Sequence, residues 1–270
     1  MKKIDLSIVI LSYNTKDFLL GCLQSIKEAD LGEIKTEIIV VDNASIDGSG
    51  ETARESIKSI TSTTRSTGHS TVSSDRIGSG QAGITGLVIE NRRNLGFAAG
   101  NNIGVKKSTG RYVLFLNPDT VLSGSVLQEV FGFMEKYKDV AVASPRLELP
   151  TGELDEASHR GFPTPWNAFC HFSGLRKIFP RSKIFAGYTI GWLLGKSTPH
   201  EVGSVSGAFF FVRREAGKKV GWWDEDYFWY GDELDFCYRL KEKGWKIFFL
   251  PQVKVLHYRG VASGIKGHSR

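Results

Sequence analysis

Short apolar runs alternate with helix-spaced apolar residues along the first half of the chain. The runs occupy residues 6–11, 38–41, 87–90, 112–116 and 140–143. Their composition is typical of strands that are covered on both faces. Between them, apolar residues recur at helical spacing in residues 16–29, 47–60, 97–107 and 126–137. This alternation predicts an α/β fold, a mostly parallel central sheet with helices on both faces.

Two stretches interrupt the pattern. Residues 61–86 are dominated by Ser, Thr and Gly, which predicts a flexible insertion without catalytic residues. Residues 145–203 are rich in Pro, Gly and aromatic residues and have no clear period, which predicts a long loop region around a substrate pocket. Regular structure is expected to return as an ordered segment at 205–213, a helix at 234–243 and short strands at 246–250 and 253–257.

Composition narrows the class of protein. With 270 residues, of which 41% are hydrophobic, the chain can bury a substantial core. The net charge of +6 favours anionic partners, but the basic residues are scattered among acids and no nucleic-acid-binding motif is present, so we expect no nucleic acid partner. The three cysteines, Cys22, Cys170 and Cys237, lie far apart, which argues against disulfides and thiolate metal sites and favours a reducing cytosol.

No segment is expected to cross a membrane. The apolar run near the N-terminus is too short for a secretory signal, so the fold is expected to begin there. The longest uncharged run, residues 184–195, is about half of the ~20 residues that span a bilayer. Residues 169–192 mix aromatic and basic side chains as interfacial segments do, although a loop packed on its own core has a similar composition. Peripheral contact with a membrane therefore stays open.

A candidate metal site follows the central strand. Asn117-Pro118-Asp119 comes directly after the run 112–116, and open α/β sheets bind ligands at the carboxyl ends of their strands. Asp119 could bind Mg²⁺ or Mn²⁺ together with a diphosphate, with His257 at the end of a later strand as a second ligand. The alternatives are a helix-capping aspartate and an ordinary surface or core histidine.

Two other segments are candidates for nucleotide binding. Asp42 follows the run 38–41 and could accept hydrogen bonds from a ribose hydroxyl or a base N–H, or it could cap a turn or helix. Asn94 and Gly96 begin the segment 94–102, whose glycines permit close approach of backbone to ligand. The helix expected there could offer free N–H groups to an anion. A tight strand-to-helix turn with packing glycines is the alternative.

A cluster of carboxylates marks a candidate general base. Asp232, Glu233 and Asp235 open the helix expected at 234–243 and follow an aromatic segment at 222–230 that could stack on a sugar ring. Crowding beside apolar rings raises the pKa of a carboxyl group towards that of a useful general base. Helix capping and surface charge are the alternative explanation.

Together these segments resemble the inverting family 2 glycosyltransferases of the GT-A fold, and more narrowly their bacterial rhamnosyltransferase-like branch. The resemblance covers most of residues 5–262 and rests on six segments in family order, residues 7–14, 41–45, 94–102, 116–119, 205–208 and 255–260. It implies one GT-A domain at 1–262. The implied parts are a nucleotide-binding half at about 1–144, an acceptor half at about 145–262, the insertion 61–86 and a tail at 263–270.

The resemblance also implies roles for individual residues. Tyr13 and Asp42 would lie at the nucleotide base and ribose, with Asn117 nearby. Asp119 would be the metal-binding residue of a DxD-type motif, and His257 would be a further ligand. Asn117 departs from the commoner motif, because it stands where the first acidic residue is usual, so one charge fewer faces the metal.

For the base, the resemblance aligns Glu233 with the catalytic carboxylate, while the reversed order of the pair keeps Asp232 as an alternative. The implied reaction transfers rhamnose, with inversion, from dTDP-rhamnose to a glycan or lipid-linked acceptor hydroxyl in cell-surface polysaccharide synthesis. It would take place in the cytoplasm, at the inner face of the membrane. A UDP-hexose donor and a non-catalytic nucleotide-sugar-binding protein are alternatives. A nucleotidyltransferase would need a basic phosphate loop after the first strand, where only Lys16 is present.

Overall fold

A computed structural model describes residues 3–62, 77–80, 84–193, 195–228 and 230–260 of the chain. The strands are β1 (Leu6–Ser12), β2 (Thr36–Asp42), β3 (Ile77–Gly80), β4 (Ile84–Glu90), β5 (Tyr112–Leu116), β6 (Thr120–Val121), β7 (Val140–Glu148), β8 (His159–Arg160), β9 (His200–Glu201), β10 (Ser204–Val205), β11 (Phe209–Arg213) and β12 (Lys246–His257). The α-helices are α1 (Lys16–Glu28), α2 (Ser49–Thr61), α3 (Gly96–Lys107), α4 (Val126–Lys136), α5 (Pro165–Phe172), α6 (Leu175–Ile178), α7 (Arg214–Val220) and α8 (Asp232–Glu242). Short 3-10 helices are η2 (Glu156–Ser158), η3 (Gly187–Thr189) and η4 (Gly191–Leu193).

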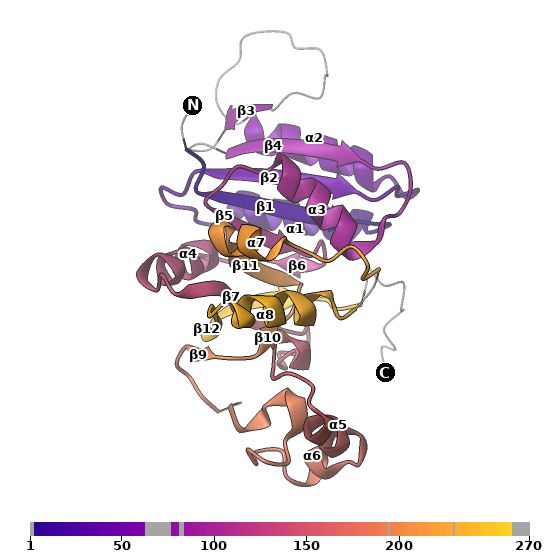
Figure 1. The fold of residues 1–270 in the computed structure, drawn as a ribbon. Helices are drawn as coiled ribbons and strands as arrows, with labels where there is room; N and C mark the ends of the chain where they lie inside the picture. The colour runs from indigo at the N-terminus through magenta and orange to yellow at the C-terminus, as the bar shows by residue number, and fades with distance from the viewer. Residues whose placement is uncertain (1–2, 63–76, 81–83, 194, 229, 261–270) are drawn as a thin grey trace.

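A mixed sheet runs through the molecule (Figure 1). Its order is β3-β4-β2-β1-β5-β11-β7-β12-β6, and β9 pairs with β12. Strands β4, β2, β1 and β5 are parallel, and so are β7 and β12, whereas β11 runs antiparallel between β5 and β7. The predicted α/β class is therefore confirmed, with an antiparallel strand inserted where the two parallel sections meet.

Both faces of the sheet are buried. On β1, the alternating residues Leu6, Ile8 and Ile10 pack in one core with residues of α1, α2 and α4. Val9 points to the opposite face, into a second core with residues of α3 and α8. Because successive strand residues face opposite sides, a strand covered by helices on both sides is apolar throughout. This explains the continuous apolar runs in the sequence.

The region 145–203 is the main correction to the sequence-based expectation. It is not one long loop, because β7 continues to Glu148 and is followed by η2, β8, α5, α6, η3, η4 and β9. These elements are too short to display a hydrophobic period. Only local signals mark them, such as Pro165 in the first turn of α5 and the Thr164 hydroxyl, which accepts a hydrogen bond from the Asn167 N–H at 3.1 Å.

Two smaller differences between the expected and the observed elements concern β12 and β3. The two strands expected at 246–250 and 253–257 are one strand, β12, and Pro251 is accommodated where the pairing of β12 with β7 shifts register between Leu250 and Lys254. Within the expected insertion 61–86, residues 77–80 form β3, which pairs antiparallel with β4. The rest of that insertion beyond β3, β4 and the end of α2, together with the tail 263–270, lies outside the described residues.

Helices α5 and α6 form a lobe at the end of the molecule away from β4 and β2, beyond β12 and β9 (Figure 1). The lobe comprises residues 162–193; it follows β8, which pairs with β10 in a separate two-stranded sheet, and it precedes β9, which pairs with β12. No helix in the described part of the chain has the length and apolar character that crossing a bilayer requires.

Candidate active site

The turn after β5 places Asp119 beside His257. Strand β5 ends at Leu116, and the chain then turns into the two-residue strand β6. Strand β6 pairs antiparallel with the end of β12, so that Thr120 lies opposite His257, and the Tyr258 N–H donates a hydrogen bond to the Asp119 carbonyl oxygen at 2.9 Å. The proximity of Asp119 and His257 therefore follows from backbone pairing.

A third buried residue completes this cluster. His257 Nε2 lies 3.4 Å from Asp119 Oδ1, and His257 Nδ1 lies 2.9 Å from Asp155 Oδ2. Asp155 is fully buried, and its other oxygen lies 3.2 Å from Arg259 Nη1. Sequence reasoning missed Asp155, because it lies 102 residues from its partner in a segment without period. The only local sign is its position just before η2, where it caps the Ala157 N–H.

Opposing effects set the charges in the cluster. Burial alone would lower the pKa of His257, but its interactions with the carboxylates of Asp119 and Asp155 raise this pKa to about 9. Burial would raise the pKa of Asp155, but its hydrogen bonds from His257 and the Ala157 N–H, together with the Arg259 charge, hold that pKa below its usual value. Two buried carboxylates thus face one imidazole.

The donors present fit a cation that is shared with a substrate. Asp119 Oδ1 is buried without a hydrogen-bond partner, and His257 Nε2 lies 3.4 Å from it. Across the described residues, no three His, Cys, Asp or Glu side chains are arranged to hold a metal ion. The chain therefore offers two donors, Asp119 and His257, which suits a hard cation that takes its other oxygens from a diphosphate and water. The predicted metal role of both residues stays a prediction.

Tyr13 and Asp42 lie side by side at the carboxyl ends of β1 and β2. Ser12 is the register partner of Asp42, so Tyr13 follows directly. Asp42 is buried; its Oδ2 accepts a hydrogen bond from the Ser45 N–H at 3.1 Å, while its Oδ1 has no partner. Tyr13 is 37% exposed. A buried carboxylate oxygen without a partner and an accessible ring at the same edge of the sheet suit a nucleoside, and the nucleotide-binding role of Tyr13 and Asp42 stays a prediction.

The segment that contains Asn94 and Gly96 forms a tight turn into α3. The Asn43 amide donates to Asn94 Oδ1 at 2.7 Å, and the Gly96 N–H donates to the same oxygen at 2.9 Å. Gly96 has a φ of +81°, and the Phe97 N–H donates to the Phe228 carbonyl at 3.3 Å. Two amides expected to be free for an anion are therefore already hydrogen-bonded, as the alternative interpretation has it. The nucleotide-binding role of Asn94 and Gly96 stays a prediction.

At the start of α8, two carboxylates differ sharply in environment. Glu233 forms an ion pair with Arg160 of β8. Asp232 Oδ1 accepts a hydrogen bond from the Glu233 N–H at 3.1 Å, whereas Asp232 Oδ2 is buried without a partner. Asp235 pairs instead with Arg239, one turn along the helix, at 2.6 Å.

The surroundings of Asp232 and Glu233 indicate which of the two carboxyl groups carries a proton. Burial, followed by the negative charge of Glu233, raises the pKa of Asp232 to about 8. Burial would also raise the pKa of Glu233, but its interactions with Asp232 and Arg160 lower it instead. Crowding was expected to raise the pKa of a carboxyl group in this cluster; the raised pKa belongs to Asp232, the alternative candidate, and the pKa of Glu233 is lowered. With the Arg160 guanidinium beside Glu233, the environment therefore favours the negative charge on Glu233 and the proton on Asp232.

A short segment connects the two clusters. Asp155 contacts His257, and Arg160, five residues later, contacts Glu233. Five extended residues span at most about 17 Å, and part of this segment is helical and therefore shorter. Glu233 is thus tied to the neighbourhood of Asp119 and His257 through η2 and β8.

The aromatic segment 222–230 is only partly available to a ligand. Trp223 is buried and packs edge-on against Phe97 and Phe115, with ring centroids 5.3 and 5.0 Å apart. Trp222 also packs against Phe115, at 6.3 Å. The two tryptophans therefore belong to the core, and the exposed rings among the described residues of the segment are Tyr227, Phe228 and Tyr230; Trp229 lies outside the described residues, and stacking on a sugar stays a prediction.

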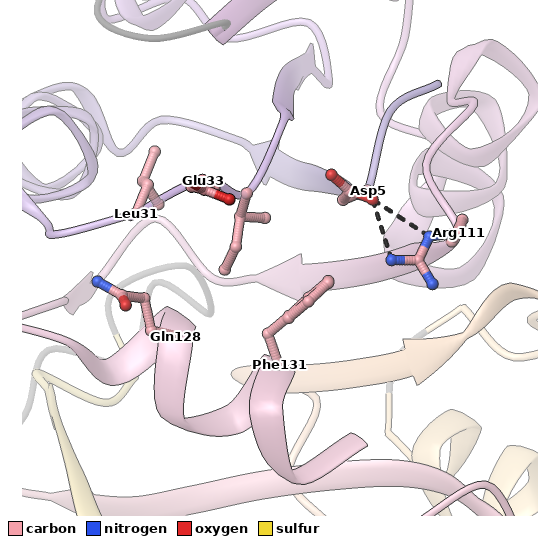
Figure 2. Close-up of a pocket in the computed structure, with 7 residues that line it drawn as sticks. Asp5, Leu31, Glu33, Arg111, Gln128 and Phe131 are labelled. Atoms are coloured by element: carbon pink, nitrogen blue, oxygen red, sulfur yellow. Dashed lines mark hydrogen bonds and ion pairs between the residues drawn. The ribbon is translucent and has the colours of Figure 1, made fainter. Parts of the chain in front are cut away.

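Two hollows in the described surface lie apart from Asp119, Glu233 and His257. One, of about 240 Å³, is lined by residues that include Asp5, Leu31 and Phe131 (Figure 2). There the Asp5 carboxylate accepts hydrogen bonds from Arg111, at the amino ends of β1 and β5 and thus at the opposite edge of the sheet from Asp119. The other, of about 450 Å³, lies over the paired strands β7 and β12, and its lining includes His159 and Leu193.

Comparison with known sequences identifies a family. The family model described as glycosyl transferase family 2 matches residues 7–72 and 85–221. The rhamnosyltransferase WbbL of Escherichia coli (strain K12) is 25% identical over 172 residues, 60% of this chain and 61% of that protein. The N-acetylglucosaminyl-diphospho-decaprenol L-rhamnosyltransferase of Mycobacterium tuberculosis is 28% identical over 153 residues, 57% of this chain and 48% of that protein. The match thus spans about half to three fifths of these curated relatives.

Comparison with solved structures supports the GT-A fold. The mannosyltransferase PcManGT from Pyrobaculum calidifontis, in complex with GDP-Man and Mn²⁺, superposes with a TM-score of 0.62 at 16% identity, covering 99% of this chain and 59% of that one. GalNAc-T7 with UDP, GalNAc and Mn²⁺ has a TM-score of 0.65 at 16% identity, covering 95% and 44%. At this identity the likeness shows the fold alone, and the fold is the one expected from the sequence.

Proposed function

The chain belongs to glycosyl transferase family 2, and from this premise we propose that it transfers a sugar from a nucleoside diphosphate to an acceptor hydroxyl with inversion. The observation that carries the proposal is the pair of buried clusters joined by η2 and β8: Asp119 with His257, and Glu233 with Arg160. One cluster suits the diphosphate side of the donor, and the other suits the acceptor side.

Each residue has a chemical task in this proposal. Tyr13 and Asp42 contact the base and ribose, and Asn117 lies beside them at the end of β5. Asp119 and His257 would hold a divalent cation, Mg²⁺ or Mn²⁺, which when bound would supply positive charge next to the leaving diphosphate. Two of the structural relatives were solved with Mn²⁺, which supports a cation of this type.

We propose Glu233 as the general base, because it is the ionised member of its pair and so can accept a proton at neutral pH. Asp232 holds its proton and is the less suitable of the two. Glu233 would take the proton of the acceptor hydroxyl while that oxygen attacks the anomeric carbon from the face opposite the diphosphate. The Arg160 guanidinium holds the Glu233 carboxylate in place.

For the substrates, we propose dTDP-rhamnose as donor and a lipid-linked glycan as acceptor, in synthesis of a cell-surface polysaccharide. The support is the similarity to two rhamnosyltransferases, one of which is named for a decaprenol-linked substrate. We assign residues 1–144 to the donor and 145–262 to the acceptor within one domain. The reaction would take place in the cytoplasm at the inner membrane face. Release of nucleoside diphosphate from a panel of donors, including UDP-hexoses, tests the choice of sugar.

The base is tested by Glu233→Gln. This variant should lose transfer by about 100-fold or more, because the amide cannot accept the proton, while calorimetry should show donor binding within about twofold of the unchanged chain. Glu242→Gln, an exposed change near the end of the same helix, is the matched control and should transfer normally. Normal turnover by Glu233→Gln would remove Glu233 from this role.

A further inference from the structure

The lobe at residues 162–193 has an unusual charge. Between residues 157 and 200 the sequence contains six Lys or Arg residues and no Asp or Glu, although the whole chain contains 35 basic and 29 acidic residues. Four of the six lie in the lobe, Arg176, Lys177, Arg181 and Lys183. Arg176 reaches back to Glu156 outside the lobe, at 3.4 Å. The lobe is therefore a positively charged projection on a chain whose charges are otherwise interspersed.

The same lobe exposes large apolar side chains. Of the sixteen large hydrophobic residues that are exposed in the described chain, seven lie in this segment, which is about a tenth of the sequence: Trp166, Phe169, Phe172, Ile178, Phe179, Ile184 and Trp192. Single exposed apolar residues need no explanation, but such a concentration marks a surface that is covered in function.

Helix α5 is inverted with respect to an ordinary surface helix. Trp166, Phe169 and Phe172 recur every three residues on its exposed side, and Phe172 is 83% exposed. The opposite side carries Cys170, which is buried, and His171, whose ring stacks on Tyr188 at 4.4 Å. A surface helix normally turns its apolar stripe to the core. Here the stripe is anchored at one end, because the Trp166 indole N–H donates to the Ile184 carbonyl at 2.9 Å and its ring lies 6.1 Å from that of Phe185, while all three rings stay exposed.

The basic and aromatic side chains are interleaved. Lys183 Nζ lies 5.3 Å from the centre of the Trp192 ring, and Lys177 directly precedes the exposed Ile178 and Phe179. Aromatic rings with basic residues beside them are typical of the boundary between lipid headgroups and acyl chains. A protein partner with an apolar groove would match the rings, but it would not require an acid-free segment of this length.

The lobe is also fixed to the acceptor side of the site. The Gly161 N–H donates to the Tyr188 carbonyl at 2.7 Å, directly after Arg160, the residue that pairs with Glu233. Phe162 packs edge-on against Tyr238 of α8, at 5.8 Å. A surface bound by the lobe would therefore lie next to the proposed base.

From charge, exposure and position we infer that the lobe at residues 162–193 docks on an anionic lipid bilayer, with the aromatic stripe of α5 at the headgroup level. This deepens the proposed function, on which it rests in one respect: a lipid-linked acceptor would reach Glu233 from that surface. The basic residues supply long-range attraction that salt screens, and the rings supply burial that salt does not weaken.

Cosedimentation of the full chain with vesicles tests the inference. The chain should bind vesicles of phosphatidylcholine mixed with phosphatidylglycerol, and bind about tenfold or more weakly to phosphatidylcholine alone or at high salt. Phe169→Ser combined with Phe172→Ser should weaken binding about tenfold or more. Arg181→Gln combined with Lys183→Gln should weaken it roughly thirtyfold, at ~1 kcal/mol per charge.

Matched controls lie on other elements. Leu20→Ser removes an exposed apolar residue from α1, and Lys58→Gln removes an exposed charge from α2; both should bind vesicles like the unchanged chain. Melting temperature and donor binding report whether each variant is folded. Binding to anionic vesicles that survives the paired Phe substitutions, or no binding at all, would overturn the inference.

Two further measurements distinguish a membrane from a second copy of the chain as the partner of the lobe, and the docking inference from the proposed function. If sedimentation in solution shows a dimer that the paired Phe substitutions dissociate, a second copy covers the face and the lipid inference is wrong. Hydrolysis of nucleotide sugars, measured without vesicles, tests the proposed function on its own. Vesicle binding without any turnover would support the membrane-docking surface and contradict the proposed glycosyltransferase activity.

Discussion

At the start of α8, two adjacent buried carboxylates lie near one cation, the guanidinium of Arg160. Because Arg160 pairs with Glu233, the negative charge of the pair is held on Glu233, and the proton remains on Asp232. Arg160 is thus a positioning residue that also sets the charge of the proposed base. This role of Arg160 could not be predicted from the sequence, because an arginine in a segment without hydrophobic periodicity gives no indication of a partner 73 residues away.

Replacing Arg160 should move the pH dependence of transfer. A carboxyl group that loses a neighbouring cation has a higher pKa, so in Arg160→Met the acidic limb of kcat/KM should shift upward by about one pH unit or more. Asp232 and the buried Cys237 thiol are the other titratable groups near Glu233. Arg160→Lys should restore part of the original profile, because it returns the charge without the fork geometry.

The control is Lys243→Met, which removes an exposed charge beyond α8 and should leave the profile unchanged. Rates are measured across the pH range with saturating cation. A variant that loses rate with no movement of the acidic limb would assign Arg160 a purely structural role.

Among the elements, α3 lies against β1 at a separation that only glycine permits. A Cβ at Gly100 would lie 2.4 Å from Leu11 Cδ1, and one at Gly104 would lie 2.4 Å from Val9 Cγ1. The two glycines are four residues apart and so line one face of the helix. Close contact of α3 with the sheet in turn fixes the turn at Asn94 and Gly96, which precedes it.

Gly104→Ala should therefore destabilise the fold by about 1–3 kcal/mol, because overpacking outweighs the gain of roughly 1 kcal/mol in helix propensity. Gly132→Ala in α4 is the matched control, since a Cβ there meets nothing within 4 Å, and it should be neutral or stabilising by up to about 1 kcal/mol. Urea unfolding measures both. Equal stabilisation by the two substitutions would contradict the close packing of α3.

Hydrophobic patterns in the sequence predicted helices and strands well where an element is long enough to bury several apolar residues in a core. Strand β5 has the expected bounds, and α1 and α4 end within one residue of expectation, because each places several apolar residues in a core. The lobe was missed for the opposite reason: α5 is short and its apolar stripe faces outward, so its pattern is not that of a core helix. At the site, Asp119 and His257 were predicted because each ends an apolar run, whereas Asp155 and Arg160 follow none.

On the scale of the whole molecule, the proposed cation and nucleotide would bring distant segments together. Asp119 lies after β5, His257 ends β12, and Asp155 lies between them in the chain. His257, the proposed metal ligand, is thus hydrogen-bonded to a carboxylate from a third segment, which fixes the orientation of its ring. Such outer partners typically change metal affinity by about 10–100-fold.

Asp155→Asn should accordingly weaken Mn²⁺ binding by about 10–100-fold, measured by electron paramagnetic resonance of the free ion. Thermal unfolding gives a second readout, because a ligand at 100 times its Kd stabilises by about 2.7 kcal/mol, or roughly 5–10 °C for a chain of this size. In the unchanged chain, Mn²⁺ and dTDP together should raise the melting temperature more than their separate effects added, because each raises the affinity of the other.

In Asp155→Asn the added effect of Mn²⁺ should be lost while that of dTDP alone remains, because Tyr13 and Asp42 lie at the ends of other strands. Glu153→Gln, two residues earlier and exposed, is the control and should behave like the unchanged chain. If Asp155→Asn binds Mn²⁺ normally with dTDP present, then His257 does not need its buried partner. In that case the hydrogen bond between His257 and Asp155 contributes nothing to cation binding, and Asp155 has no positioning role at the proposed site.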